Sequence, residues 1–155
     1  NNPEHVTTAL VGVNGELLPA WYAMREVISE VRSFEQAFLQ FDWQKCLYCL
    51  SEEGRENPLF QELDRNTDDI LQGVNTDADV VVGCFGRDGR RAYLVSNVSD
   101  PAYRLTAAIE IRFYGDYNVT VYQNGKKYVA VTDGNRLLLS VRSGSGAFVV
   151  LEGKR

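Results

Sequence analysis

The stretch "LTAAIEIRFYGDYNVTVYQNGKKYVAVT", residues 105–132, decides the fold class of this chain. Every second residue of its first part is apolar, in the row Leu105, Ala107, Ile109, Ile111 and Phe113. Polar residues stand between them, and such alternation is typical of a half-buried strand in an antiparallel sheet. Asn124-Gly125 then separates two further strand-like runs, residues 117–123 and 126–132, and predicts a tight hairpin between them.

The same pattern continues on both sides of this stretch. Residues 79–85, "DVVVGCF", are apolar on both faces and predict a central strand, and Asp88-Gly89 predicts a second hairpin. The other apolar runs are "AYLVSNV" (92–98), "RLLLSV" (136–141) and "AFVVLE" (147–152). About seven to eight short strands at this spacing indicate an antiparallel sandwich or barrel, and we expect a β-sandwich domain over residues 78–155.

A long helix is expected before the strands, over residues 19–41. No Gly or Pro occurs between Ala20 and Glu53, and Pro19 stands at a first helical position, which tolerates proline. One apolar stripe runs at spacings of three and four: Met24, Val27, Val31, Phe34, Phe38 and Phe41. Trp21, Tyr22 and Ile28 widen this face. The sequence therefore predicts a mainly β protein in which one long amphipathic α-helix precedes the sandwich.

The chain divides into three parts. Residues 1–50 read as a strand–turn–helix connector, with a strand at 6–12 and another at 43–50. Residues 51–77 form a polar connector with a short helix near 58–65 and a short strand at 68–74. The third part is the sandwich, residues 78–155.

Composition limits the classes of function. Apolar residues make up 45% of the chain and charged residues 24%, and the net charge is −5. This is the composition of a globular protein, and the acidic balance argues against nucleic acid and anionic membranes as main partners. No apolar run reaches the roughly 18 residues of a membrane span, and no signal peptide is visible. We expect a soluble protein, bacterial cytoplasmic or secreted. Because the chain starts without Met, we also expect an excised fragment.

No catalytic constellation or metal site is evident. The neighbouring acids, Glu52/Glu53, Asp68/Asp69 and Asp77/Asp79, lie in the polar connector outside any apolar pocket that would raise their pKa values. "NTDAD" (75–79) lacks the glycine and the distal glutamate of a calcium loop. "CLYC" (46–49) lacks further ligands, since His5 is the only histidine, and Cys46, Cys49 and Cys84 read as buried or incidental thiols. We expect no catalytic residue, no metal and no cofactor.

The tyrosines near the turns are the remaining candidates for a site. Tyr103, Tyr114 and Tyr117 belong to this group. Exposed rings of this kind stack on the apolar faces of sugars, and the same rings also fill the core and rim of a sandwich. Two glycosylation sequons, at Asn97 and Asn118, matter only in a eukaryotic secretory context.

Three stretches carry a resemblance to a known family. "ALVGVNGELLPAWYAMREVISEVRSF" (9–34) resembles the final strand–turn–helix of the catalytic barrel in bacterial TIM-barrel glycoside hydrolases. "VVVGCFGRDGRRAYLVSNVSDP" (80–101) and the later run ending in "LLLSVRSGSGAFVVLE" (137–152) resemble the C-terminal β-sandwich that follows such a barrel. The resemblance implies that the catalytic carboxylates lie upstream, in a part of the parent polypeptide that this chain does not include.

From this resemblance we expect a non-catalytic C-terminal β-sandwich module that packs on the catalytic domain of the same polypeptide. The alternative is a carbohydrate-binding module that uses Tyr103, Tyr114 and Tyr117. A small enzyme is the third reading, and no converging acid, base or nucleophile favours it. If the helix serves two bodies, Trp21, Tyr22 or Ile28 should be exposed here or covered by a second copy of the chain in a homo-oligomer.

Overall fold

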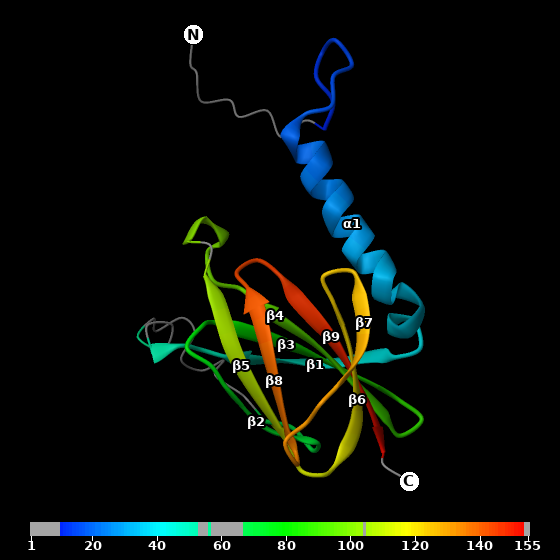
Figure 1. Cartoon of the computed structure of the whole chain (residues 1–155), viewed down its shortest axis with the longest axis vertical. Coiled ribbons are helices and arrows are strands. Elements are labelled where there is room, and N and C mark those ends of the chain that lie inside the picture. The colour runs from blue at the N-terminus through cyan, green and yellow to red at the C-terminus, as the bar shows by residue number, and fades with distance from the viewer. Residues whose placement is uncertain (1–9, 53–55, 57–66, 104, 154–155) are drawn as a thin grey trace.

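The structure, a computed structural model, describes residues 10–52, 56, 67–103 and 105–153 (Figure 1). These residues form one α-helix, one short 3-10 helix and nine strands. The helices are α1 (Pro19–Phe38) and η2 (Pro101–Tyr103). The strands are β1 (Asp42–Cys49), β2 (Leu71–Asn75), β3 (Val80–Arg87), β4 (Arg90–Asn97), β5 (Thr106–Phe113), β6 (Tyr117–Gln123), β7 (Lys126–Ala130), β8 (Arg136–Arg142) and β9 (Gly146–Gly153).

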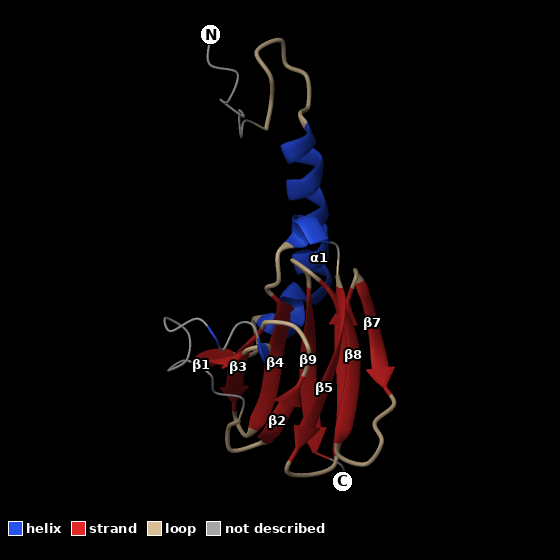
Figure 2. Cartoon of the chain, turned by 90° about the vertical axis from the view of Figure 1, so that its left-hand side faces the viewer, coloured by secondary structure: helices blue, strands red, loops and turns tan. Residues whose placement is uncertain are grey.

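Two antiparallel sheets form the body of the protein. The larger sheet has six strands in the order β1-β3-β4-β9-β6-β7, and the smaller has three in the order β2-β5-β8. Both expected hairpins are present. Their turn residues all have positive φ, at Asp88 (52°), Gly89 (75°), Asn124 (51°) and Gly125 (70°), as the favoured two-residue hairpin requires. The mainly β fold with a preceding helix is confirmed, and Figure 2 shows the first turns of the helix extending beyond the strands.

The sandwich begins before residue 78, where the sequence pattern placed its start. β1 pairs with β3, and β2 pairs with β5, so both strands belong to the sheets. Their inward residues, Leu47 on β1 and Leu71 and Val74 on β2, are buried in the main core. Strands are expected at both places, 43–50 and 68–74, and what the sequence does not show is their membership of the sandwich sheets, because pairing with β3 and β5 is a long-range contact.

The main core lies between the two sheets. β5 contributes Ala107, Ile109, Ile111 and Phe113, as the alternation predicts. Leu105, which the pattern places in the same row, precedes the strand and is exposed. The six-stranded sheet supplies the facing residues, with Tyr93 and Val95 on β4 and Val149 and Leu151 on β9 among them.

A second apolar cluster lies on the other side of the six-stranded sheet, under the helix. We call it the outer cluster, and its buried members are Phe41, Phe85, Ala92, Phe148 and Val150. Phe34, Ala37 and Phe38, from the last turns of α1, cover it. The helix ends at Phe38, three residues before its predicted end, because Leu39, Gln40 and Phe41 form hydrogen-bonded turns that lead into β1.

A small hairpin precedes the helix. Val11 bridges Leu17, and Gly12 N–H donates to the Glu16 carbonyl at 2.8 Å. Only residues 10–12 of the strand expected at 6–12 lie in the described part. The short helix expected near 58–65 lies outside the described residues.

Candidate functional site

The C-terminal half of α1 is fixed to the six-stranded sheet by aromatic rings. Phe34 stacks on Phe148 with ring centres 5.4 Å apart, and Phe38 lies 5.6 Å from Phe148 and 5.1 Å from Phe85. One turn earlier, Glu30 Oε1 accepts a hydrogen bond from the backbone N–H of Asn124 in the β6–β7 hairpin, at 3.3 Å. The helix is therefore held at β9 and at one hairpin, and both contacts lie beyond its midpoint.

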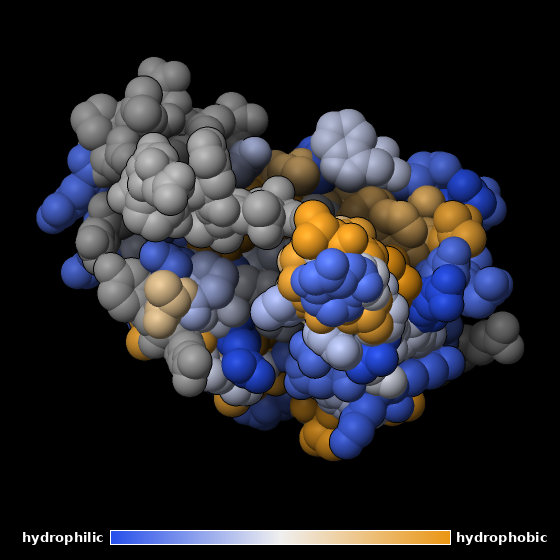
Figure 3. Space-filling view, turned by 90° about the horizontal axis from the view of Figure 1, so that it is seen from above, coloured by the Kyte–Doolittle hydropathy of each residue, from blue (hydrophilic) through white to orange (hydrophobic). Residues whose placement is uncertain are grey.

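The N-terminal half of α1 extends past the sandwich with apolar side chains in solvent. Figure 1 shows this part of the helix projecting beyond the sheets, and Figure 3 shows hydrophobic side chains, in orange, around the projecting end. The exposed apolar residues of the helix are Tyr22, Met24, Val27, Ile28 and Val31. Since so much apolar surface is uncommon on an isolated globular protein, this half of the helix is the first candidate for a docking surface.

The three expected interface residues differ in their surroundings. Tyr22 is 46% exposed and Ile28 is 44% exposed, whereas Trp21 is half-buried. Trp21 and Tyr22 meet edge-on, with ring centres 5.2 Å apart, and the Arg25 guanidinium lies over both rings. Because Tyr22 and Ile28 are six residues apart, they lie on different sides of the helix. The three residues therefore do not form one patch.

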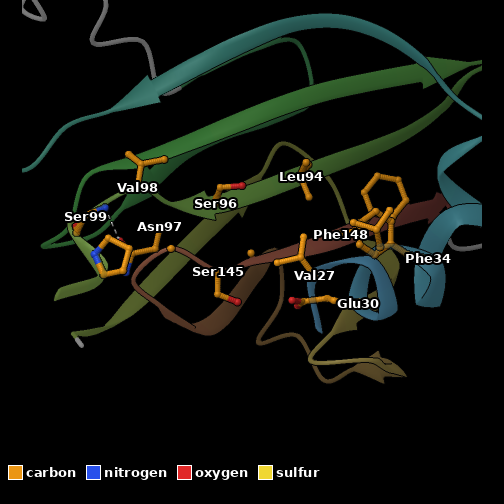
Figure 4. Close-up of a pocket in the computed structure, with 14 residues that line it drawn as sticks. Val27, Glu30, Phe34, Leu94, Ser96, Asn97, Val98, Ser99, Ser145 and Phe148 are labelled. Atoms are coloured by element: carbon orange, nitrogen blue, oxygen red, sulfur yellow. Dashed lines mark hydrogen bonds between the residues drawn. The ribbon is translucent and has the colours of Figure 1, made fainter. Parts of the chain in front are cut away.

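A groove of about 490 Å³ runs between the helix and the outer face of the six-stranded sheet. Figure 4 shows Val27 and Phe34 on the helix side of the groove and Leu94 and Phe148 on the sheet side. The lining residues, which include polar groups from the end of β4 and the β8–β9 turn, are Val27, Glu30, Val31, Phe34, Leu94, Ser96, Asn97, Val98, Ser99, Pro101, Gly144, Ser145, Gly146 and Phe148. The apolar walls of the groove continue the outer cluster toward the free half of the helix.

Asn97 holds the polar end of this groove together. Its side chain is buried, its amide Nδ2 donates to the Val141 carbonyl at 3.1 Å, and its Oδ1 accepts from the backbone N–H of Ser99 at 3.1 Å. Its backbone N–H donates to the Ser145 carbonyl, and its backbone carbonyl accepts from the Gly144 N–H. Asn97 therefore joins the end of β4 to the β8–β9 turn. The sequence marks it only as a sequon, and its inward position in the alternation of β4 is the signal that could have identified this role.

The expected sugar-binding tyrosines do not form a common platform. Tyr114 follows β5 and is 63% exposed. Tyr117 is half-buried and packs edge-on against Phe113, with ring centres 6.0 Å apart. Tyr103 belongs to η2, and its side chain is outside the described part of the structure. Tyr114 is thus the exposed ring among those whose side chains are described.

The contacts described for the acids of the connector stabilise the fold. Asp68 Oδ1 accepts hydrogen bonds from the N–H groups of Ile70 and Leu71 at the start of β2, and the buried Tyr93 hydroxyl donates to the same carboxylate at 3.2 Å. Burial, followed by the charge of Asp68, raises the pKa of Tyr93 far above its ordinary value. These contacts fix the carboxylate in one place and hold it as a structural group.

Asp69 and Asp79 also have partners. Asp69 pairs with Arg91 at 2.7 Å, and the hydrogen bond from Arg91 lowers the pKa of Asp69. In "NTDAD", Asp79 Oδ1 accepts from both the N–H (2.8 Å) and the hydroxyl (2.7 Å) of Ser51. This contact ties the end of β1 to the start of β3.

The cysteines do not come together as a pair. Cys46 and Cys49 are three residues apart on β1, so they point to opposite faces of the sheet, and Cys46 is exposed whereas Cys49 is buried. Burial, with the nearby charge of Asp68, raises the pKa of the buried Cys84 to about 12. Within the described residues, no three His, Cys, Asp or Glu side chains converge as metal ligands. The helices of this part of the chain include none with the length and apolar character to cross a membrane.

Comparison of the chain with protein-family models, with curated proteins and with solved structures finds no match.

Proposed function

We propose that this chain is a non-catalytic C-terminal β-sandwich module of a glycoside hydrolase. The module packs on the catalytic domain of the same polypeptide and supports it. In this proposal α1 belongs to both bodies: its last turns are the support of the sandwich, and its first turns are the attachment to the catalytic domain.

One observation carries the proposal. The apolar stripe of α1 is continuous, yet the sandwich covers only its last part, which begins at Phe34 and includes Phe38. The remaining stripe and the groove beside it stay open to solvent. Burying apolar surface is worth about 25 cal/mol per Å², so a second folded body on this side would gain stability from covering both. A helix that completes a preceding domain fits this arrangement.

The polar groups of the sandwich also support a non-catalytic role. The carboxylates of Asp68, Asp69 and Asp79 are engaged by backbone, hydroxyl or guanidinium groups that stabilise the fold. An acid or base for glycoside hydrolysis instead needs a partner carboxylate across an open cleft.

Two measurements test the proposal. The purified chain should release no chromophore from a panel of aryl glycosides, and turnover that follows the protein through purification would refute the non-catalytic assignment. Trypsin should cut the isolated chain at Arg25, on the projecting half of α1. In the polypeptide that carries the catalytic domain, this site should be protected. Equal cleavage in both would contradict the packing of α1 on that domain.

A second candidate function is carbohydrate binding through Tyr114, the alternative that the sequence left open. Its ring is 63% exposed, and Arg112, two residues earlier, lines a hollow of about 310 Å³ together with Gln72 and Asn75. Planar amide and guanidinium groups suit sugar hydroxyls, and an exposed aromatic ring suits a sugar face. Affinity electrophoresis in polysaccharide gels should show retardation that Tyr114→Ala removes. Tyr128→Ala, which changes an exposed tyrosine on β7, should leave the retardation unchanged. No retardation on any polysaccharide would count against this function.

A further inference from the structure

We propose that the free half of α1 docks on a partner helix whose apolar seam is flanked by acidic residues. The inference rests on the proposed function and adds to it the chemistry of the surface that receives this module. It is carried by the spacing, the exposure and the charge of residues on the first turns of the helix.

Four apolar residues of α1 form a seam that suits another helix. We define the free seam as Trp21, Met24, Ile28 and Val31, whose spacings are three, four and three residues. Residues at this spacing share one face of a helix and interdigitate with a second helix that has the same repeat. Met24, Ile28 and Val31 are each exposed, at 44–48%. Glu35 follows on the same face, so the apolar seam covers the projecting half of α1 and extends one turn further, to the level where Glu30 meets the β6–β7 hairpin.

Two arginines border one side of the free seam. Arg25 and Arg32 are seven residues apart, which places them in one row along the helix. They take part in none of the ion pairs between described residues. The Arg25 guanidinium lies 5.1 Å from the centre of the Trp21 ring, directly at the border of the seam. A partner helix that covers the seam would therefore meet two positive charges along this border, and carboxylates there would complement them.

The other border of the free seam is apolar. Val27 lies there and lines the groove with Val31. A helix seated on the seam would therefore place acidic side chains against the arginines and apolar side chains over the mouth of the groove. The docking surface is continuous with the outer cluster, because Phe34 and Phe148 belong to both the groove and that cluster.

A second copy of this chain matches the surface poorly. In an antiparallel pair of free seams, Arg25 and Arg32 would face the same residues of the other copy, and like charges at flanking positions destabilise a helix pair. In a parallel pair the arginine row would face the Val27 row, which offers no carboxylate. The charge pattern therefore favours a different helix over a homodimer.

A pair of synthetic helical peptides tests the inference directly. Both carry the same Leu and Ile seam at spacings of three and four, and they differ only in having Glu or Lys at the flanking positions. Trp21 reports binding by fluorescence in a Trp43→Phe background, since the second tryptophan is exposed on β1. We expect the Glu-flanked peptide to bind at least about fivefold more tightly at low salt, with the preference shrinking at high salt.

Variants of the protein separate the contribution of the free seam to peptide binding from the contribution of the arginine charges. Ile28→Glu should abolish binding of the Glu-flanked peptide, whereas Ala23→Glu, at an exposed position off the seam and not three or four residues from either arginine, should leave most of it. The double variant Arg25→Glu/Arg32→Glu should reverse the preference toward the Lys-flanked peptide.

Several outcomes would overturn the inference. Equal binding of the two peptides, or a preference of the unmodified protein for the Lys-flanked peptide, would refute an acidic partner helix. Binding that survives Ile28→Glu would show that the free seam is not the binding surface. A free chain that sediments as a dimer and becomes monomeric with Ile28→Glu makes a second copy the occupant. These failures differ from failure of the proposed function, because turnover of aryl glycosides would refute a non-catalytic role without changing the peptide preference.

Discussion

Replacing Phe148 should detach the helix from the sandwich. Phe148 has 0% of its surface exposed and lies at the centre of the outer cluster. Five aromatic rings lie 5.4–6.2 Å from its own, those of Phe34, Phe38, Phe41, Phe85 and Tyr122. A buried Phe→Ala change costs about 3–5 kcal/mol in total, and this figure already includes the lost ring contacts. Because the last turns of the helix can shift toward the space left behind, we expect the middle of that range, about 4 kcal/mol for Phe148→Ala.

The matched control is Val149→Ala, its neighbour on β9. Val149 is also fully buried, but it points into the main core between the sheets. We expect a loss of about 2 kcal/mol there, spread over the whole sandwich. Urea denaturation gives both free energies of unfolding, and hydrogen exchange measured by peptide shows where protection is lost. Phe148→Ala should remove protection from α1 while the strands of the main core keep theirs, and the denaturant slope should fall because less surface is exposed in the remaining transition.

Two results would refute this reasoning. If α1 keeps its protection in Phe148→Ala, the ring contacts are not what holds the helix. If Phe148→Ala and Val149→Ala lose protection in the same segments, the two clusters unfold as one unit, and the helix is not a separately anchored element.

Three further changes have defined outcomes. Asn97→Ala should cost about 2–3 kcal/mol in urea denaturation, because it leaves buried backbone groups without their side-chain partner; a loss below about 0.5 kcal/mol would contradict the role of Asn97 at the groove. A thiol reagent at pH 8 should label Cys46 quickly and Cys84 only after unfolding, because Cys84 is buried with its pKa raised to about 12; fast labelling of Cys84 would contradict its burial. Arg91 lowers the pKa of Asp69 in the folded state, so the stabilisation is present at neutral pH and is lost as the pH falls through the lowered pKa. Asp69→Asn should therefore make the urea midpoint fall less between pH 5 and 3 than in the unmodified protein. An equal fall in both proteins would contradict the pairing.

The strands and hairpins could be predicted because local sequence determines them. The alternation in residues 107–113 places one row of β5 in the core, and Asn124-Gly125 adopts the positive φ values that its hairpin needs. These features depend on side-chain period and backbone preference, which act over a few residues. The helix start at Pro19 was likewise predicted from a local signal.

Long-range contacts explain what could not be predicted. Nothing in residues 42–49 or 71–75 shows that they pair with β3 and β5. The sequence therefore predicts a sandwich that starts at residue 78, after both of these strands. In the sequence, Asn97 is one more polar residue at a strand end. Its role follows from its hydrogen bonds to Val141 and to the β8–β9 turn, which only the structure shows. The tyrosines were grouped by type and by nearness to turns, yet Tyr114 lies in solvent while Tyr117 packs on Phe113, because the two stand on opposite sides of a turn.

The helix shows where sequence and structure together say more than either alone. An isolated helix of about a dozen residues is marginal in water, and helices in proteins gain most of their stability from packing. The anchored turns of α1 can nucleate the rest, which explains how the projecting half forms without support from the sandwich. They do not explain why its residues are apolar, since a solvated extension would be equally helical with polar side chains at Met24, Ile28 and Val31. The apolar seam is therefore unnecessary for the fold seen here, and the docking surface that we propose would supply the physical reason for its presence.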